Sequence, residues 1–471
     1  MELSNLENKK IVILGLAKEG MDNFGFLRKL FPNKILGLAD EKEFNQLPPE
    51  IQALIKKDSP SPRLRRTSKR IKTHFGKACL KSLSQYDVIF KTPGIPLRKL
   101  RPFLKKRQKV TSQTQIFFEN SPGLIVGVTG TKGKGTTTSI IYEILKKAGK
   151  SVASIGNIGT PVLSFLLPEN KKDVFVYELS SHQLQNLRKS PKIAIFLNLY
   201  QAHLDYYKTF KEYSRAKENI ALFQNQDDYF VYNKDQKFLR KLSRKTKAQK
   251  LTFGLESKNL DCYVKNGWIF YKKEKILKES EIPLIGRFYL YNIMAAVISA
   301  KLLGVSSSTI RKAIKGFKSL PHRLEFVGKF RGIEFYNDSL ATIPEATILG
   351  IQTFKDKIGT LILGGYDAKQ NFKTLAQAIL KTGIENLIFF PATGQRIWKE
   401  ILKENKVSKK NFENLKPYFV DNMKDAISIA FSQTRKGRVC LLSCACPSFG
   451  VFKDYKERGE LFKKFVKLYA P

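Results

Sequence analysis

The sequence predicts an α/β fold built from three domains in series. A chain of 471 residues exceeds what one hydrophobic core usually supports. Apolar strand-like segments alternate with amphipathic helical segments along the chain. Breaks that contain proline, at residues 121–123 and 319–321, divide it into domains of residues 1–121, 122–318 and 319–471.

The first domain has the order of elements expected of a nucleotide-binding unit. Residues 10–14 predict a strand, residues 15–20 a glycine turn that leads into a helix, and residues 35–40 a second strand that ends in an acid, Asp40. A further strand, at residues 86–91, ends in a tight turn that contains Pro93 and Gly94. Because ligands of open α/β sheets bind at the carboxyl ends of strands, we expect a ligand site at these turns.

The second domain begins with the most informative motif of the chain. Residues 124–128 predict a buried strand and residues 136–148 a helix, with Thr129-Gly130-Thr131-Lys132-Gly133-Lys134 between them. Glycines let backbone N–H groups close around phosphate oxygens, and Lys134 supplies a cation for the β- and γ-phosphates. The motif predicts a nucleoside triphosphate site; a Gly-Lys-rich surface turn is the alternative.

Metal ligands are expected close to this loop. Gly135 stands where a Ser or Thr hydroxyl usually contacts Mg²⁺, so Thr136 or Thr137 would have to replace it. Glu178 ends a predicted buried strand, and a carboxylate in that position is an expected Mg²⁺ ligand. A solvated strand-end acid is the alternative for Glu178.

Two further side chains are candidates for the same site. His203 follows a strand predicted at residues 193–199 and shares a face with Asp205 if the backbone there is extended. We expect His203 to contact metal or substrate, with a structural role as the alternative. Lys217, in a predicted helix at residues 213–220, points to the same site or is solvated.

The remaining elements alternate in the same way. A helix is predicted at residues 291–303, and shorter β segments at residues 251–277. Further strands are predicted at residues 174–178, 229–232, 333–336, 360–363, 387–390 and 439–442.

The formal net charge of +43 is the most unusual global property of the chain. A charge of this size attracts polyanions, above all nucleic acid. The densest basic segments, residues 63–72 and 97–109, lack the interleaved aromatic residues of a base-stacking surface. We therefore favour a solvated surface that attracts phosphate-bearing small substrates over a nucleic-acid partner.

Other features of the composition favour a cytoplasmic protein. No run of about 18 apolar residues predicts a transmembrane helix, and the polar N-terminus does not resemble a signal peptide. The five cysteines are scattered, and Cys444-Ala445-Cys446 lacks the spacing of a zinc site. We expect neither membrane insertion nor structural zinc.

Several separate motifs, in order from about residue 10 to residue 465, resemble the Mur ligase family. They include the phosphate loop, Glu178-Leu179-Ser180-Ser181-His182-Gln183, Leu320-Pro321-His322-Arg323 and Asn337-Asp338-Ser339. Within this family, five further motifs resemble the group that adds D-glutamate. They are Gly15-Leu16, Thr92-Pro93-Gly94-Ile95, Gly156-Asn157-Ile158-Gly159, Leu363-Gly364-Gly365 and Cys444-Ala445-Cys446-Pro447-Ser448.

The resemblance implies an ATP-dependent ligase of peptidoglycan precursor synthesis. Such an enzyme joins D-glutamate to UDP-N-acetylmuramoyl-L-alanine through an acyl phosphate. It also implies a Rossmann-like first domain for the UDP substrate, a central P-loop ATPase-like domain for ATP, and a Rossmann-like third domain for the amino acid. ATP, two Mg²⁺ ions and a carbamate on Lys217 are then expected, in a monomer whose partners are small substrates.

The residues implied for these ligands form four sets. Catalysis would use Lys134, His203 and Lys217. Metal would be held by Glu178, His203, Thr136 and Lys217. ATP would contact Gly130, Thr131, Lys132, Gly133, Lys134, Gly135, Thr136, Asn292, Arg323 and Asp338. The other substrates would contact Leu16, Lys18, Asp40, Thr92, Gly94, Asn157, Ser180, Gln183, Thr342, Lys369, Ser448, Phe449 and Tyr455.

The chain departs from the family pattern at several positions. Leu340 stands where the family has a lysine, Ala202 replaces an acid, Tyr289 replaces an asparagine, and Lys369 lies one position late after the glycine pair. These departures leave two alternatives open, and the net charge of +43 leaves a third. The chain could be a ligase with another amino-acid acceptor, a weakly active relative that binds its ligands, or a nucleotide-dependent nucleic-acid-binding protein.

Overall fold

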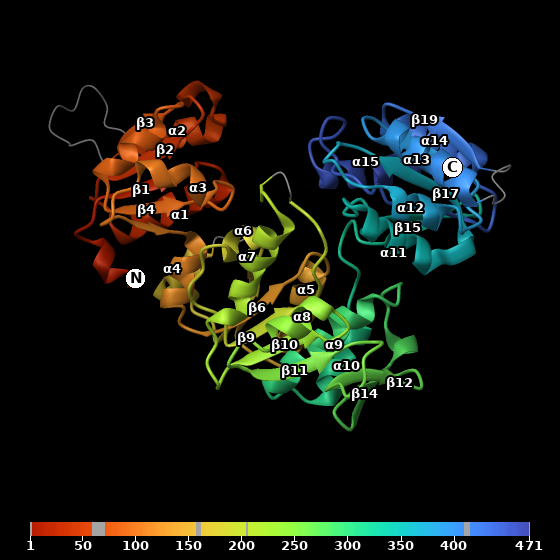
Figure 1. Cartoon of the computed structure of the whole chain (residues 1–471), viewed down its shortest axis with the longest axis horizontal. Helices are drawn as coiled ribbons and strands as arrows, with labels where there is room; N and C mark the ends of the chain where they lie inside the picture. The colour runs from red at the N-terminus through yellow and green to blue at the C-terminus, as the bar shows by residue number, and fades with distance from the viewer. Residues whose placement is uncertain (1, 59–70, 157–161, 204–205, 409–414, 471) are drawn as a thin grey trace. The chain divides into compact units, whose positions relative to one another are not determined.

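The chain folds into two compact units in this computed structural model, which describes residues 2–58, 71–156, 162–203, 206–408 and 415–470. One unit comprises Met1–Glu279 and Tyr291–Ile314, and the other Ser280–Leu290 and Lys315–Pro471. The first unit holds two β-sheets and the second holds one (Figure 1). The α/β class is confirmed. The domain boundaries stay predictions, because the first two sheets share one unit.

The first sheet is parallel throughout, in the strand order β3-β2-β1-β4-β5. Its central strand β1 is apolar and fully buried, the pattern of a strand covered on both faces. The strands are β1 (Ile11–Leu14), β2 (Leu36–Asp40), β3 (Ile71–Phe75), β4 (Val88–Lys91) and β5 (Lys109–Thr111). The helices are α1 (Lys18–Leu30), α2 (Pro49–Asp58), α3 (Leu97–Leu100) and α4 (Gln113–Asn120).

The turn between β1 and α1 requires glycine, as the sequence predicts. Gly15 has a φ of 90°, in the region that favours glycine. A Cβ atom on Gly20 would lie 1.8 Å from Gly15 O, so only glycine lets the first turn of α1 approach this loop. The turn therefore brings the helix N-terminus to the carboxyl end of β1.

The second sheet has the strand order β14-β13-β12-β11-β10-β9-β6-β8-β7. Strands β6 to β11 pair in parallel, and β12 to β14 form an antiparallel edge. The strands are β6 (Leu124–Thr129), β7 (Val152–Gly156), β8 (Val174–Glu178), β9 (Ile193–Phe196), β10 (Tyr229–Asn233), β11 (Gln249–Phe253), β12 (Cys262–Lys265), β13 (Trp268–Tyr271) and β14 (Glu274–Lys278). The helices are α5 (Lys134–Lys147), α6 (Ser181–Leu184), α7 (Phe210–Leu222), α8 (Lys237–Leu242), α9 (Tyr289–Leu302) and α10 (Ser307–Lys315).

The third sheet has the strand order β15-β16-β20-β17-β18-β19, parallel except for the β15–β16 hairpin. The strands are β15 (Glu325–Phe330), β16 (Ile333–Asn337), β17 (Ile358–Gly364), β18 (Asn386–Phe390), β19 (Lys416–Phe419) and β20 (Val439–Leu442). The helices are α11 (Pro344–Phe354), α12 (Lys373–Ile379), α13 (Gly394–Ser408), α14 (Met423–Gln433) and α15 (Tyr455–Leu468).

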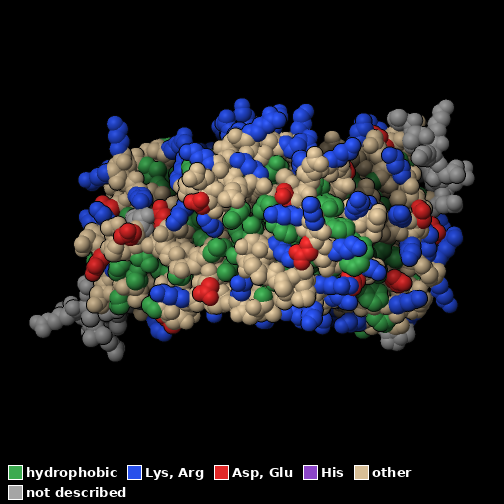
Figure 2. All heavy atoms as spheres, turned by 90° about the horizontal axis from the view of Figure 1, so that it is seen from below, with side chains coloured by type: hydrophobic (Ala, Val, Ile, Leu, Met, Phe, Trp, Pro, Cys, Tyr) green, Lys and Arg blue, Asp and Glu red, His purple; other side chains and the backbone are tan. Residues whose placement is uncertain are grey.

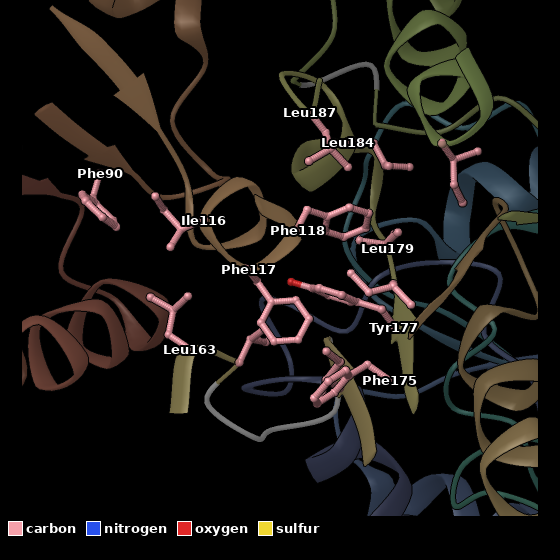
Figure 3. Close-up of a cluster of buried hydrophobic side chains, with 14 of the residues drawn as sticks. Phe90, Ile116, Phe117, Phe118, Leu163, Phe175, Tyr177, Leu179, Leu184 and Leu187 are labelled. Atoms are coloured by element: carbon pink, nitrogen blue, oxygen red, sulfur yellow. The ribbon is translucent and has the colours of Figure 1, made fainter. Parts of the chain in front are cut away.

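One hydrophobic core runs through both sheets of the first unit. Helix α4 contributes Phe117, whose ring centroid lies 5.0 Å from that of Phe175 and 5.8 Å from that of Tyr177, both edge-on. Figure 3 shows these rings together with Phe90 of the first sheet. The Tyr177 hydroxyl lies 3.2 Å from the Thr114 hydroxyl, so this buried phenol is hydrogen-bonded.

An acid and a lysine interact inside the first domain. Burial raises the pKa of the Glu19 carboxyl to about 7, against the opposing effect of Lys91. Burial likewise lowers the pKa of Lys91 to about 8, against the opposing effect of Glu19. Lys91 Nζ donates to Thr92 O at 3.0 Å and to Ile95 O at 2.8 Å. The lysine therefore holds the turn that follows β4.

Basic side chains are dispersed over the face of the molecule that Figure 2 shows. Figure 2 shows Lys and Arg across the whole visible face, with Asp and Glu scattered singly among them. This arrangement is typical of a solvated surface rather than of a single binding stripe. No helix within the described ranges is long and apolar enough to cross a lipid bilayer.

Truncation of Phe117 tests the shared core. We expect Phe117→Ala to lower the free energy of unfolding by about 3–5 kcal/mol, because a fully buried ring is replaced by a cavity. Phe223→Ala is the control, since Phe223 is 36% exposed, and should cost about 1 kcal/mol or less. Guanidinium unfolding followed by circular dichroism measures both. Equal losses in the two variants would contradict the shared core.

Replacement of Glu19 tests its raised pKa. The folded protein binds the Glu19 proton more tightly than the unfolded chain, so this group contributes stability below pH 4.5 that is lost as the pH rises through about 7. Glu19→Gln cannot ionise, and its stability relative to the wild type should rise between these pH values by on the order of 3 kcal/mol. Denaturant unfolding at pH 4.5 and pH 7.5 measures the difference, and a pH-independent difference would contradict it.

Candidate functional site

The predicted phosphate loop joins β6 directly to α5. Gly130 and Gly133 have φ values of 158° and 85°, and Gly133 is the N-cap of α5. A Cβ atom on Gly133 would lie 2.4 Å from Asn292 Oδ1 of α9, so glycine is required there. Asn292, predicted to contact ATP, therefore packs against the loop. The helix begins at Lys134, two residues before the predicted start, because the left-handed Gly133 caps it.

Asn198 holds the loop in shape. Its Oδ1 accepts from Lys132 N at 2.9 Å, its Nδ2 donates to Lys132 O at 3.0 Å, and its O accepts from Thr131 N at 3.0 Å. The Thr131 hydroxyl accepts from Tyr200 N at 2.9 Å and lies 3.0 Å from the Tyr213 hydroxyl. The segment after β9 therefore fixes the loop before any ligand binds.

Thr136 is placed to replace the missing hydroxyl of the motif. It is 1% exposed, and its Oγ1 is buried with no hydrogen-bond partner in the part of the chain that the structure describes. A buried hydroxyl without a partner is costly, and a metal ion or phosphate oxygen would satisfy it. Among the described residues, the buried hydroxyls of Thr137 and Thr138 likewise have no partner, so both Thr136 and Thr137 fit the ligand role that Gly135 cannot take.

Glu178 and Lys217 form a charged cluster with Lys134 at the carboxyl edge of the sheet. Val128 pairs with Glu178 in the β6–β8 ladder, which places this acid beside the phosphate loop at 6% exposure. Lys217 of α7 is 2% exposed, and its Nζ donates to Gly130 O at 3.0 Å. Burial, helped by Lys134 and opposed by Glu178, lowers the pKa of Lys217 well below its usual range. The amine of Lys217 is therefore easier to deprotonate than that of a solvated lysine.

The oxygen donors present suit Mg²⁺. Within the ranges described, no group of three or more His, Cys, Asp and Glu side chains could hold a metal ion. Mg²⁺, however, is commonly held by one or two carboxylates together with waters and substrate phosphates. Glu178 and the Thr136 hydroxyl fit that pattern, so the donor set agrees with a metal that is completed by a bound nucleotide.

His203 is not on an extended strand, and this expectation was wrong. Strand β9 ends at Phe196, and His203 has a φ of 57°, in the left-handed region. Its ring centroid lies 5.0 Å from that of His182 and 5.9 Å from that of Tyr213, whose ring lies 5.2 Å from Lys217 Nζ. Asp205 lies outside the described residues. Ring packing, rather than strand geometry, thus holds His203 near Lys217.

Two predicted substrate contacts pair with each other. Ser180 Oγ and Ser180 N both donate to Gln183 Oε1 at 2.9 Å, and Gln183 N donates to Ser180 Oγ at 3.3 Å. This capping box starts α6 directly after the strand that carries Glu178. The pair has a structural role, and its contact with substrate stays a prediction.

The predicted UDP-substrate contacts gather at one edge of the first sheet. Asp40 Oδ2 accepts from Leu16 N at 2.8 Å, which joins the ends of β1 and β2. The Thr92 hydroxyl donates to Leu14 O at 3.2 Å, which joins the end of β4 to the same place. Lys18 begins α1 and Gly94 follows Thr92 in the turn. Asn157 lies outside the described residues.

Asp338 and Arg323 are held within the second unit. Asp338 Oδ2 accepts from Ser443 Oγ at 2.9 Å, and Asp338 Oδ1 from Leu324 N at 3.3 Å. Arg323 O accepts from Ser319 Oγ at 2.7 Å and from Tyr289 Oη at 3.3 Å. The carboxyl end of β16 and the segment before β15 are thus tied together.

The predicted amino-acid contacts Thr342, Lys369, Ser448 and Phe449 lie on loops, and Tyr455 is the first residue of α15. Gln370 Nε2 donates to Thr342 O at 3.5 Å, which brings the loop of Lys369 to that of Thr342. Ser448 is buried, and the 56% exposed Phe449 ring lies 6.3 Å from the ring of Tyr366.

Sequence reasoning missed Arg458, a fully buried guanidinium on α15. It donates to Ser339 Oγ at 3.0 Å, Ser339 O at 2.7 Å and Cys446 O at 3.1 Å. Tyr455, one turn earlier, accepts from Ser339 Oγ at 2.7 Å through its backbone O. An arginine in an amphipathic helix usually looks solvated in sequence. Only its spacing of four residues from Phe462, which is in turn four from Val466, could have placed it on the buried face of the helix.

Comparisons with known proteins agree with this geometry. The model of the Mur ligase middle domain matches residues 128–300, which contain the phosphate loop, Glu178, His203 and Lys217. The UDP-N-acetylmuramoylalanine–D-glutamate ligase of Clostridium tetani is 32% identical over 98% of this chain and 97% of its own length. The enzyme of the same name from Bacillus mycoides is 34% identical over 98% of both chains.

Solved structures share the fold at lower identity. MurF from Acinetobacter baumannii has a TM-score of 0.62 at 15% identity, over 99% of this chain and 93% of its own. The MurF ligase of Thermotoga maritima, solved in complex with ADP, has a TM-score of 0.58 at 18% identity, over 100% of this chain and 98% of its own. On its full-length identity to the curated relatives, the chain belongs to the Mur ligase family.

Proposed function

We propose that the chain is an ATP-dependent ligase that adds D-glutamate to UDP-N-acetylmuramoyl-L-alanine in peptidoglycan precursor synthesis. The observation that carries the proposal is the preformed phosphate loop with Glu178, Lys217 and the unsatisfied Thr136 hydroxyl beside it. The curated relatives of that name match nearly the full length of the chain. Its substrates, ATP and a nucleotide sugar, suit a cytoplasmic protein, and we propose that it acts there as a monomer.

The proposed chemistry follows from charge. The substrate carboxylate attacks the γ-phosphorus of ATP, which yields an acyl phosphate and ADP. The amine of D-glutamate then attacks the acyl carbon, phosphate leaves, and the amine loses a proton. Lys134 and the N–H groups at the start of α5 offset the repulsion between the phosphate oxygens and the incoming carboxylate. The catalytic contribution of these groups is electrostatic and positional.

Glu178, Thr136 and His203 are the residues proposed to hold Mg²⁺. Bound Mg²⁺ would neutralise charge on the transferring phosphate. Because burial lowers the pKa of Lys217, its amine can lose a proton and react with carbon dioxide, which gives a carbamate and releases one further proton. The carbamate would turn a buried amine into an oxygen donor next to Glu178. Asn292, Arg323 and Asp338 remain the other proposed contacts of ATP.

D-glutamate is the proposed acceptor, with Thr342, Lys369, Ser448, Phe449 and Tyr455 as its contacts. Leu340 cannot supply the cation that the family places there. Lys369 is the proposed replacement, because its loop is joined to Thr342 through Gln370. The turn of Lys369 is rigid, since its N donates to Asp367 Oδ1 at 2.8 Å and Asp367 pairs with Arg396.

Phosphate release tests the whole reaction. The purified chain, with ATP, Mg²⁺ and UDP-N-acetylmuramoyl-L-alanine, should release phosphate only when D-glutamate is added. Release with a different amino acid would replace the proposed acceptor. No release with any amino acid would favour the relative that binds its ligands without turnover.

Lys134→Ala should lower kcat by about 100-fold to 1,000-fold, because one preorganised charge at the developing phosphate is lost. Lys146→Ala is the matched control, as an exposed lysine in the last turn of the same helix, and should leave kcat unchanged. Near-normal turnover of the Lys134 variant would mean that ATP binds elsewhere.

Lys217→Ala should lose most activity and regain part of it with formate or acetate, whose carboxylate can occupy the vacated space. Lys211→Ala, an exposed lysine on the same helix, should need no such rescue. Wild-type protein equilibrated with ¹³C-bicarbonate should show a carbamate carbon signal in NMR spectra that the Lys217 variant lacks. A Lys217 variant with full activity would argue against the carbamate.

A further inference from the structure

Tyr206 lies at a junction of three segments of the first unit. Its hydroxyl is 3.1 Å from Pro93 O and 3.1 Å from Gln185 Oε1, and it shares its single proton between these two acceptors. Burial raises the pKa of Tyr206 to about 12, against an opposing effect of Arg98. The hydroxyl therefore keeps its proton at neutral pH and acts as a donor.

Both acceptors belong to segments with proposed roles. Pro93 lies in the turn between Thr92 and Gly94, which are proposed contacts of the UDP substrate. Gln185 directly follows α6, and its O accepts from Asn219 Nδ2 at 3.1 Å. Asn219 is a buried residue of α7, two positions after Lys217. The hydroxyl of Tyr206 thus joins the substrate turn to the helix that carries Lys217.

The ring of Tyr206 makes a separate connection. Its centroid lies 4.3 Å from that of His182, and His182 lies 5.0 Å from His203, both edge-on. His203 keeps a φ of 57°, a conformation that non-glycine residues hold only where their surroundings enforce it. His203 in turn lies 5.9 Å from the ring of Tyr213, whose hydroxyl is 3.0 Å from Thr131 Oγ1 in the phosphate loop.

We propose that Tyr206 is a positioning residue that holds the UDP-substrate turn through its hydroxyl and His203 beside the phosphate loop through its ring. The inference rests on the proposed function. The two parts of the side chain have separable roles. The hydroxyl holds the substrate turn, and the ring holds the histidine pair in its strained position.

Two substitutions separate these roles. Tyr206→Phe keeps the ring, and should raise both the KM for UDP-N-acetylmuramoyl-L-alanine and the Kd for UDP by about fivefold, the usual effect of one neutral hydrogen bond. Its kcat and its half-saturating Mg²⁺ concentration should stay within about twofold of wild type. Tyr206→Ala also removes the ring, and should in addition lower kcat by about tenfold and raise the Mg²⁺ requirement.

Tyr418→Phe is the matched control. Its hydroxyl donates to Gln433 Oε1 at 3.0 Å in the second unit, so the substitution removes the same kind of bond away from the proposed junction. It should change none of these constants. Circular dichroism and thermal unfolding of all three variants establish that each is folded, and UDP binding by calorimetry gives a readout that does not depend on turnover.

The outcomes distinguish this inference from the proposed function. Wild-type protein that neither binds UDP nor turns over would overturn both. Active wild-type protein with unchanged UDP affinity in Tyr206→Phe would overturn this inference alone, since the hydroxyl would then have no role at the substrate turn. A Tyr206→Ala variant that matches Tyr206→Phe in kcat and Mg²⁺ requirement would likewise overturn it, since the ring would then have no role of its own.

Discussion

The rest of the site depends on the fixed shape of the loop between β6 and α5. Its N–H groups can face phosphate oxygens only if Gly130 and Gly133 adopt φ values that other residues avoid. Asn198 clamps the loop from the neighbouring strand end, and Lys217 donates to Gly130 O from α7. Because these bonds exist within the protein alone, a bound triphosphate need not order the loop.

Burial changes the chemical properties of the side chains beside the loop. Two lysines and a glutamate meet at the end of one sheet, and one of the lysines is almost fully enclosed. Enclosing an ammonium group costs more free energy than enclosing a neutral amine, so burial makes Lys217 easier to deprotonate than a solvated lysine. A solvated lysine is mostly protonated at neutral pH, and its ammonium form cannot attack carbon dioxide. The same enclosure leaves the Thr136 hydroxyl without a partner, a cost that a ligand would remove.

At the carboxyl edge of the third sheet, hydrogen bonds from buried side chains hold the loops together. Arg458 supplies donors to two loops from inside the unit, and no exposed cation could hold both with the same rigidity. Asp338 binds Ser443 and Leu324 N in the same region. Leu340, a departure from the family pattern, directly follows Ser339 on one of the two loops that Arg458 binds.

Much of the fold follows from local sequence. Strands β8 and β20 coincide with their predicted ranges, and the other predicted strands overlap their observed ones, because short apolar runs between turn signals leave few alternatives. The phosphate loop and Glu178 were likewise predictable, since glycine spacing and a strand-end acid are local features. The helix start was misplaced by two residues, because only the left-handed Gly133 decides where α5 begins.

The sequence by itself determined which functional motifs the chain carries and in what order they follow one another. They are a glycine turn, a phosphate loop, a strand-end acid, a histidine and a lysine. Only the tertiary structure decided that Lys217 is buried, that His203 is left-handed and packed among rings, and that Arg458 and Tyr206 hold loops. The physical reason is that burial, ring packing and long-range hydrogen bonds join residues far apart in sequence. A local pattern carries no information about such partners.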